Sequence, residues 1–241
     1  MTMTQAGGGQ SLYFAYGSNL AFEQMARRCP RSRFVGRARL FGYQFQINER
    51  GYANVIKRPD LNLYVDGLCY RLTEADETQL DRAEGVPVAY QKVELEVEFF
   101  PASPDFLGRD VTDIIRCGGL PVTPGKQSDD GQGVPAKVMV YLSAEYVSPG
   151  RPWDEYIERM ELGLQCALRM GISETYVELH VRPWLRTGKG TRGGGGGGGG
   201  GGVTNNAWTA ALTQVNNNAG GELKNASSSG VSPLFTLPNL P

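Results

Sequence analysis

Hydrophobic and polar residues alternate along several stretches between residues 11 and 186, and this pattern predicts β-strands. The clearest case is 89–100, where apolar residues share one face and charged residues the other, as in a half-buried antiparallel strand. Residues 11–16 are rich in aromatic side chains and predict a buried first strand. The other predicted strands are 32–47, which would be one bent strand, 53–57, 64–72 and 136–143.

Other stretches have the apolar spacing of helices. Helix 73–85 has the clearest ends, because Thr73 opens a capping box with the aspartate three residues on and Gly85 supplies a stop. An earlier helix is predicted at 21–29, and Asn19 is expected to cap its N-terminus. The remaining predicted helices are 154–171, which is amphipathic, and 173–185, a short closing helix or helix plus turn.

Together these elements predict an α+β fold. A mixed, mostly antiparallel β-sheet would close, or nearly close, into a barrel with helices packed around it. Residues 11–186 would form this one domain, while 101–135, rich in Pro, Gly and Asp, is expected to be an irregular insertion. Residues 1–10 are expected to be disordered, and 187–241 to be a Gly-rich linker followed by a disordered low-complexity tail.

Charge and cysteine content exclude several classes of protein. The 24 Lys and Arg residues balance 25 Asp and Glu residues, so no nucleic-acid partner is indicated, and no apolar run is long enough to span a membrane. Cys29, Cys69, Cys117 and Cys166 lack the spacing of a zinc site or disulfide framework, which favours a reducing, cytoplasmic setting. The single histidine, His180, is expected to be structural, so an enzymatic base would be a carboxylate.

The segment YGSNL, residues 16–20, follows the aromatic first strand and precedes a helix. A Gly-Ser-Asn turn exposes consecutive backbone N–H groups without bulky side chains to shield them. Such groups bind an anion or a developing oxyanion well. An ordinary tight turn has the same composition, and the residues alone leave both interpretations open.

Glu84 is the second candidate, since it closes the helix 73–85. The negative end of the helix dipole and burial would each raise the pKa of a carboxyl group there, toward the value that a general acid or base needs near neutral pH. An exposed glutamate at a helix end is the ordinary alternative.

The two candidates in this order, YGSNL and then DRAEGVPVAYQKVELEV at 81–97, resemble the γ-glutamylcyclotransferase family. The resemblance covers most of residues 11–180. A looser similarity of VMVYLS and DEYIERMELG to the family suggests that Tyr141 and Tyr156 face the substrate. The insertion at 101–135 and the Gly-rich tail depart from the family, and the insertion leaves the preference for a leaving group open.

The resemblance implies a γ-glutamylcyclotransferase-like fold and an intramolecular reaction. The α-amine of a γ-glutamyl group would attack its own γ-carbonyl and release 5-oxoproline and an amine or amino acid. Glu84 would be the general acid and base, and no metal or cofactor is implied. The implied substrate-binding residues are Tyr16, Gly17, Ser18, Asn19 and Leu20, acting mainly through backbone N–H groups, and Tyr141 and Tyr156, supplying hydroxyls.

Three alternatives stay open at this level. The enzyme could act on γ-glutamyl amines, or on glutathione adducts in a fungal secondary-metabolite pathway of the epipolythiodioxopiperazine type. It could also be a non-catalytic binding module with the same cavity. The expected partner in every case is a small γ-glutamyl molecule, with no nucleic acid or membrane, and the oligomeric state is open, a homodimer included.

Overall fold

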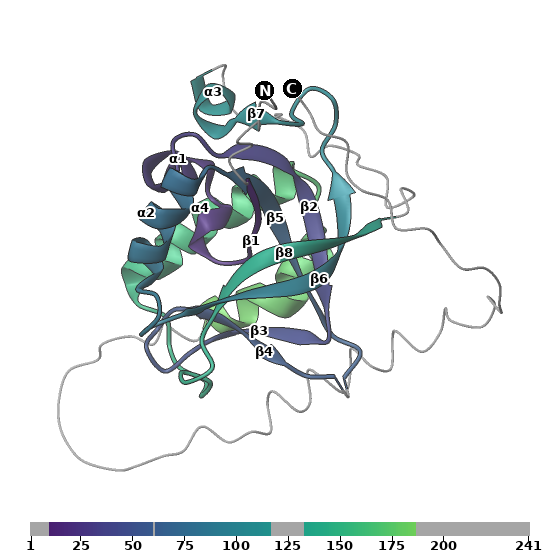
Figure 1. The fold of residues 1–241 in the computed structure, drawn as a ribbon. Coiled ribbons are helices and arrows are strands. Elements are labelled where there is room, and N and C mark those ends of the chain that lie inside the picture. Colours follow the sequence, from purple (N-terminus) through teal and green to yellow (C-terminus); the bar gives the residue numbers. More distant parts are fainter. Residues whose placement is uncertain (1–9, 60, 117–132, 187–241) are drawn as a thin grey trace, which may run out of the picture. The chain divides into compact units, whose positions relative to one another are not determined.

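The computed structural model describes residues 10–59, 61–116 and 133–186, which all lie in one unit of the chain, Met1–Gly190 (Figure 1). The expectations for residues 1–9 and 187–241 fall outside the described residues. Gln10, the first described residue, is exposed and directly precedes the first strand.

Five strands close into a barrel. Their order is β5-β1-β8-β6-β2, and a further pairing of β2 with β5 completes the ring. Only β1 and β8 pair in parallel, so the predicted mixed, mostly antiparallel barrel is confirmed. The strands are β1 (Ser11–Ala15), β2 (Arg33–Phe41), β5 (Tyr64–Leu72), β6 (Gln91–Pro101) and β8 (Val134–Leu142).

Two smaller strand pairings adjoin the barrel. β3 (Tyr43–Ile47) and β4 (Ala53–Lys57) form a separate antiparallel ribbon, and β7 (Arg109–Asp110) pairs with the start of β2. Figure 1 shows the ribbon at the opposite end of the barrel from β7. The ribbon matters for the site described below, because its turn reaches the mouth of a cavity.

The helices cover the barrel unequally. Figure 1 shows α1, α2 and α4 together on one side. The longer helices are α1 (Phe22–Arg28), α2 (Glu74–Glu84), α3 (Val111–Arg116) and α4 (Asp154–Arg169). A short turn η1 (Ser18–Leu20) precedes α1, and a continuous helical run of α5 (Glu174–Tyr176), η2 (Val177–Val181) and α6 (Arg182–Arg186) ends the described residues.

The helix ends agree with the sequence pattern at α2 and disagree at α1. The Asp76 N–H donates to Thr73 Oγ1 over 3.2 Å, and Gly85 ends α2 in the left-handed conformation with φ 66° and ψ 38°. The predicted cap at Asn19 is wrong, because α1 begins after Ala21 with no side-chain cap. Asn19 instead lies inside the η1 turn, where its side chain is used elsewhere.

Two predicted segments are divided more finely than expected. The bent strand 32–47 is two strands, β2 and β3, separated by Gly42 with φ 74°. The segment 101–135 is not irregular throughout, because it contains β7 and α3, while its residues 117–132 are outside the described part. Val111 and Ile114 are almost fully buried, and burying this apolar pair accounts for a helix that the Pro- and Gly-rich composition obscured.

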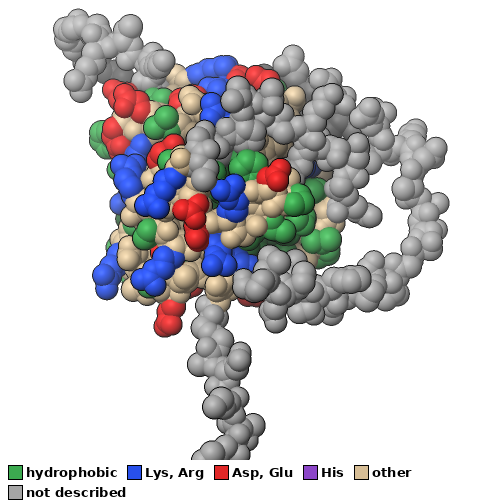
Figure 2. All heavy atoms as spheres, turned by 90° about the horizontal axis from the view of Figure 1, so that it is seen from above, with side chains coloured by type: hydrophobic (Ala, Val, Ile, Leu, Met, Phe, Trp, Pro, Cys, Tyr) green, Lys and Arg blue, Asp and Glu red, His purple; other side chains and the backbone are tan. Residues whose placement is uncertain are grey.

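Aromatic side chains fill the core where β1, α1, β2 and β5 meet. Phe22, Phe34 and Tyr70 contact one another with ring centroids 5.2–5.9 Å apart, and all three are buried. Such rings contribute large buried areas to the core. On the face seen in Figure 2, basic side chains lie in separate patches, with acidic and hydrophobic side chains among them.

Candidate active site

A cavity of about 320 Å³ opens between the η1 turn, the end of α2, the β3–β4 turn and α4. Seven of the eight residues predicted for the site line it: Tyr16, Gly17, Ser18, Asn19, Glu84, Tyr141 and Tyr156. They come from four separate parts of the chain, and the fold brings them to one place. The turn and the glutamate chosen from sequence therefore do meet.

The turn after β1 is shaped by close packing against a tyrosine. The Leu20 N–H donates to the Gly17 carbonyl over 2.9 Å and closes η1. A Cβ atom on Gly17 would lie 3.1 Å from the Tyr156 hydroxyl and 3.3 Å from Cβ of Ala53. Glycine at this position thus allows α4 and β4 to approach the turn closely.

Leu20 does not belong to the cavity lining, which corrects its predicted place in the substrate cradle. It is 3% exposed, and a Cβ built on Gly163 of α4 would lie 3.0 Å from Cβ of Leu20. The leucine therefore packs the turn against α4. Its role in the YGSNL segment is to hold the turn in place, because its apolar side chain is buried in the protein.

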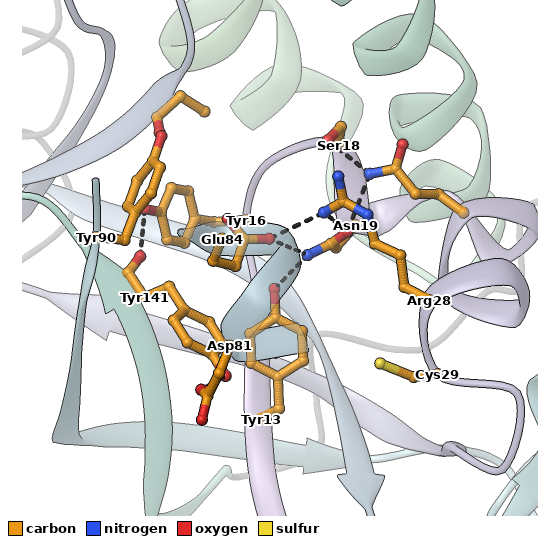
Figure 3. A network of polar contacts seen from close by, with 12 residues as sticks. Tyr13, Tyr16, Ser18, Asn19, Arg28, Cys29, Asp81, Glu84, Tyr90 and Tyr141 are labelled. Carbon is orange, nitrogen blue, oxygen red and sulfur yellow. Dashed lines mark hydrogen bonds and ion pairs between the residues drawn. The ribbon is translucent and has the colours of Figure 1, made fainter. Parts of the chain in front are cut away.

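Glu84 is the only carboxylate among the described residues that line the cavity. Its Oε1 accepts hydrogen bonds from Asn19 Nδ2 and from Arg28 Nη1, each over 2.9 Å (Figure 3). Burial raises the pKa of this carboxyl above its ordinary value near 4.5, and the Arg28 charge and the Asn19 amide oppose the increase. The sequence also predicted a raised pKa for Glu84. A raised pKa favours proton exchange by this carboxyl nearer neutral pH.

Asn19 holds Glu84 through its side chain, whereas the sequence suggested a cradle made mainly of backbone. Its Nδ2 also donates to the Tyr13 hydroxyl over 2.8 Å, and its Oδ1 accepts from Gln24 and from Arg28, each over 2.9 Å. Every polar atom of the Asn19 side chain is thus engaged (Figure 3). This network fixes the orientation of the amide and, through it, the position of the carboxylate.

Ser18 takes part in the same network from the opposite side. Its Oγ accepts from Gln24 Nε2 over 2.6 Å, so Gln24 bridges Ser18 and Asn19. All three are buried. A buried network whose members are satisfied is expected to be rigid.

The two tyrosines assigned from the looser similarity have different surroundings. The Tyr141 hydroxyl donates to Asp81 Oδ1 over 2.6 Å, and its backbone carbonyl accepts from the Tyr16 hydroxyl, also over 2.6 Å. The Tyr156 hydroxyl accepts from the Ala53 N–H over 3.2 Å, and burial raises its pKa to about 12. Tyr141 therefore uses its proton within the protein, and Tyr156 can still donate one into the cavity.

Sequence reasoning missed several lining residues. Nothing in the local sequence pattern links Arg28 to a glutamate 56 residues away. The sequence pattern predicts Tyr13 and Tyr90 only as strand residues, yet both line the cavity. The Tyr90 hydroxyl donates to the Ala53 carbonyl over 2.8 Å. The alternation of side chains along β1 indicates which residues lie on the same face of the strand as Tyr13. It does not indicate which residue from another element contacts Tyr13.

His180 and the described cysteines lie elsewhere. The His180 ring lies 5.3 Å from the Tyr176 ring and 5.5 Å from the Tyr64 ring, centroid to centroid, and burial lowers its pKa. Cys69 and Cys29 are fully buried, and burial raises the pKa of Cys29 to about 12. These groups are packed in the protein and do not line the cavity, as expected for His180 from the sequence.

Residues 13–108 match the model of the family described as gamma-glutamyl cyclotransferase, AIG2-like. This segment of the chain is similar to that family. The resemblance seen in the sequence is thus confirmed for the part that carries the turn and Glu84. Tyr141 and Tyr156 lie beyond the matched segment, so only their geometry places them at the site. The comparison with curated protein sequences gave no match.

Two solved structures, each with a TM-score of 0.50, support the same fold. A protein named gamma-glutamyl cyclotransferase is 20% identical with a TM-score of 0.50, over 85% of this chain and 99% of that one. YkqA from Bacillus subtilis is also 20% identical with a TM-score of 0.50, over 73% of this chain and 54% of that one. An uncharacterized protein from Homo sapiens is 21% identical with a TM-score of 0.49, over 84% and 98% of the two chains.

Two searches of the described residues were negative. None of their helices is both long and apolar enough to cross a membrane. Within the same residues, no group of three or more His, Cys, Asp and Glu side chains could hold a metal ion.

Proposed function

We propose that this protein is a γ-glutamylcyclotransferase that converts the γ-glutamyl group of its substrate to 5-oxoproline. The observation that carries the proposal is the Glu84 carboxyl group, which lies in the cavity with a raised pKa beside the turn that follows β1. The family match over the segment containing both features supports it.

The reaction needs no nucleophile from the protein. The α-amine of the γ-glutamyl group attacks its own γ-carbonyl carbon, a C–N bond forms, and the carbonyl oxygen takes up negative charge. The tetrahedral intermediate then expels the nitrogen of the former amide, and the carbonyl is restored in the five-membered ring. A cavity that holds the substrate folded back on itself provides much of the acceleration, because intramolecular reactions reach effective molarities of about 10⁵–10⁸ M.

Glu84 carries out the proton transfer that these reaction steps require. The nitrogen of the α-ammonium loses two protons in all, one before it attacks and one after the C–N bond has formed. The ionised Glu84 carboxylate accepts the first, and the protonated carboxyl donates it to the departing nitrogen, so Glu84 returns to its starting state. The second proton passes to the released amine, which leaves as an ammonium ion. A carboxyl whose pKa is raised toward neutrality is suited to both steps.

The turn and the arginine supply the charge and dipoles for binding. Gly17, Ser18 and Asn19 line the cavity at the start of a helical turn, where backbone N–H groups favour negative charge. They would hold the α-carboxylate or the developing oxyanion. The Tyr156 hydroxyl, beside Gly17, is a further donor at the same wall.

The test is a product assay. The purified protein is incubated with γ-glutamyl-alanine and, separately, with glutathione, and 5-oxoproline is followed by mass spectrometry. Glu84→Gln keeps the size of the side chain and removes proton transfer, so the rate should fall by about 10²–10⁴-fold. Glu74→Gln is the matched control, because Glu74 is an exposed residue at the start of the same helix and outside the cavity lining. A Glu84→Gln variant as active as the control would remove Glu84 from the mechanism.

A further inference from the structure

The cavity is far more basic than the protein as a whole. Arg28, Arg50, Arg82 and Arg159 line it, and within the described part of the chain Glu84 is the one acidic residue of the lining. Four positive charges therefore face one negative charge, in a chain whose formal net charge is −1. A charge of one sign gathered in a concave site raises the local concentration of oppositely charged ligands.

Two of the four arginines already have acidic partners. Arg28 pairs with Glu84. Arg159 pairs with Glu155 over 2.9 Å, but the Glu155 side chain is 60% exposed. Such surface ion pairs contribute little free energy, so another anion can replace Glu155 as the partner of Arg159. The charge of Arg159 also reaches the cavity, since it opposes the burial-driven increase in the pKa of Glu84.

Arg50 and Arg82 form no ion pair with any described residue, although both line the cavity. The Arg50 guanidinium lies 4.8 Å from the centre of the Tyr146 ring, and its charge opposes the burial-driven increase in the pKa of Tyr90. Arg82 stands two residues before Glu84 on α2. Both cations are thus placed at the cavity with capacity for an external anion.

The turn that carries Arg50 is held in place by specific contacts. The Arg50 N–H donates to Asn48 Oδ1 over 3.1 Å, and its carbonyl accepts from Trp153 Nε1 over 2.8 Å. Gly51 follows with φ 86°, and a Cβ there would lie 2.6 Å from the Trp153 ring. The backbone of this turn is fixed against α4, so the arginine starts from a defined position at the cavity.

We infer that the leaving group of the substrate is an acidic amino acid or peptide carrying at least two carboxylates, recognised by Arg50 and Arg82. This inference rests on the proposed function. The γ-glutamyl group itself carries one ammonium and one carboxylate, which balance, so the surplus of positive charge in the lining is left for the leaving group. A leaving group with no net charge would leave the two arginines unpaired, and a cationic one would be repelled.

The test compares substrates of nearly equal size. The kcat/KM for 5-oxoproline release is measured with γ-glutamyl-glutamate, γ-glutamyl-glutamine and γ-glutamyl-ε-lysine. We expect the kcat/KM of γ-glutamyl-glutamate to exceed that of γ-glutamyl-glutamine by about 1.4- to 5-fold, since its additional carboxylate adds one exposed ion pair. The advantage should shrink as salt is added, because the Debye length falls from about 10 Å at 0.1 M to about 3 Å at 1 M.

Variants then locate the recognition. Arg50→Gln and Arg82→Gln should each lower the ratio of the two kcat/KM values, and the double variant should bring it close to one. Arg116→Gln is the matched control, since the Arg116 side chain is 75% exposed on α3, outside the cavity lining, and its removal should leave the ratio unchanged. A ratio that survives in the double variant would overturn the assignment to these arginines.

The outcomes separate this inference from the proposed function. Equal turnover of all three substrates overturns the inference and leaves the cyclotransferase activity standing. If no substrate yields 5-oxoproline, the proposed activity fails, and calorimetric binding of γ-glutamyl-glutamate against γ-glutamyl-glutamine to the unmodified protein decides the inference. Tighter binding of the glutamate compound would support the acidic ligand, and equal or absent binding would overturn it.

Discussion

Replacing Arg28 by Met tests how the site sets the proton affinity of Glu84. The substitution keeps an unbranched apolar stem and removes the cation that contacts Glu84 Oε1 over 2.9 Å. Asn19 retains its own hydrogen bond to the carboxylate and its contact with Gln24, so the turn keeps much of its network. Because the Arg28 charge opposes the effect of burial, its loss must raise the pKa of Glu84 further.

The size of the shift follows from the geometry of the pair. Coulomb's law over 2.9 Å gives about 6 kcal/mol at an effective dielectric constant of about 20. This corresponds to about 4 pKa units, at about 1.36 kcal/mol for each unit. Water reduces the value, since the side chains of Arg28 and Glu84 are 25% and 15% exposed. Carboxylates beside an arginine shift by about 1–3 units, and we expect a change in that range.

The assay is the pH dependence of kcat/KM for 5-oxoproline formation, which reports the pKa of the free enzyme. Glu84 must be ionised to accept a proton, so activity rises with pH through its pKa. Arg28→Met should move this rise to higher pH by about 1–3 units. Arg27→Met, an exposed neighbour on α1, should leave it nearly unchanged. A rise that stays in place in Arg28→Met, or moves to lower pH, would refute the reasoning.

The remaining predictions concern stability and the supporting residues. Gly36→Ala should destabilise the fold by more than about 2 kcal/mol in urea unfolding, because φ is 152° and the new Cβ would lie 2.2 Å from the Phe100 carbonyl oxygen. Tyr141→Phe should lower the free energy of unfolding by about 1–3 kcal/mol, since Asp81 loses a 2.6 Å hydrogen bond; an unchanged value would show that water replaces the hydroxyl. Because the pKa of Glu84 is raised in the folded state, its protonated form contributes to the free energy of unfolding of the wild-type protein. This contribution is fully present below about pH 4.5 and is lost as the pH rises through the higher folded-state pKa. Glu84→Gln lacks this loss, so its melting temperature relative to wild type should increase with pH above about 4.5; a constant difference would contradict the shift.

Local patterns in the sequence determined a large part of this structure. Alternation along 89–100 identified β6, the capping box placed the start of α2, and Gly85 marked its end, because these signals depend on residues within a few positions of each other. The pairing of YGSNL with Glu84 was also visible, although only as a resemblance to a family. The same local reasoning failed at Asn19, whose side chain serves a distant partner instead of the helix that follows it.

The charges and hydroxyls that surround Glu84 are set by contacts between distant parts of the chain. Barrel closure between β2 and β5 and the packing of α1 beside α2 bring Arg28 to a carboxylate 56 residues away, and a single hydrogen bond joins Tyr16 to a residue 125 positions later. Packing against α4 also removed Leu20 from the cavity that its motif suggested. The spacing of apolar residues along the chain shows which residues lie on the same face of a helix or strand. Contacts between elements depend on how these faces pack together, and the periodicity within a single element carries no information about that packing.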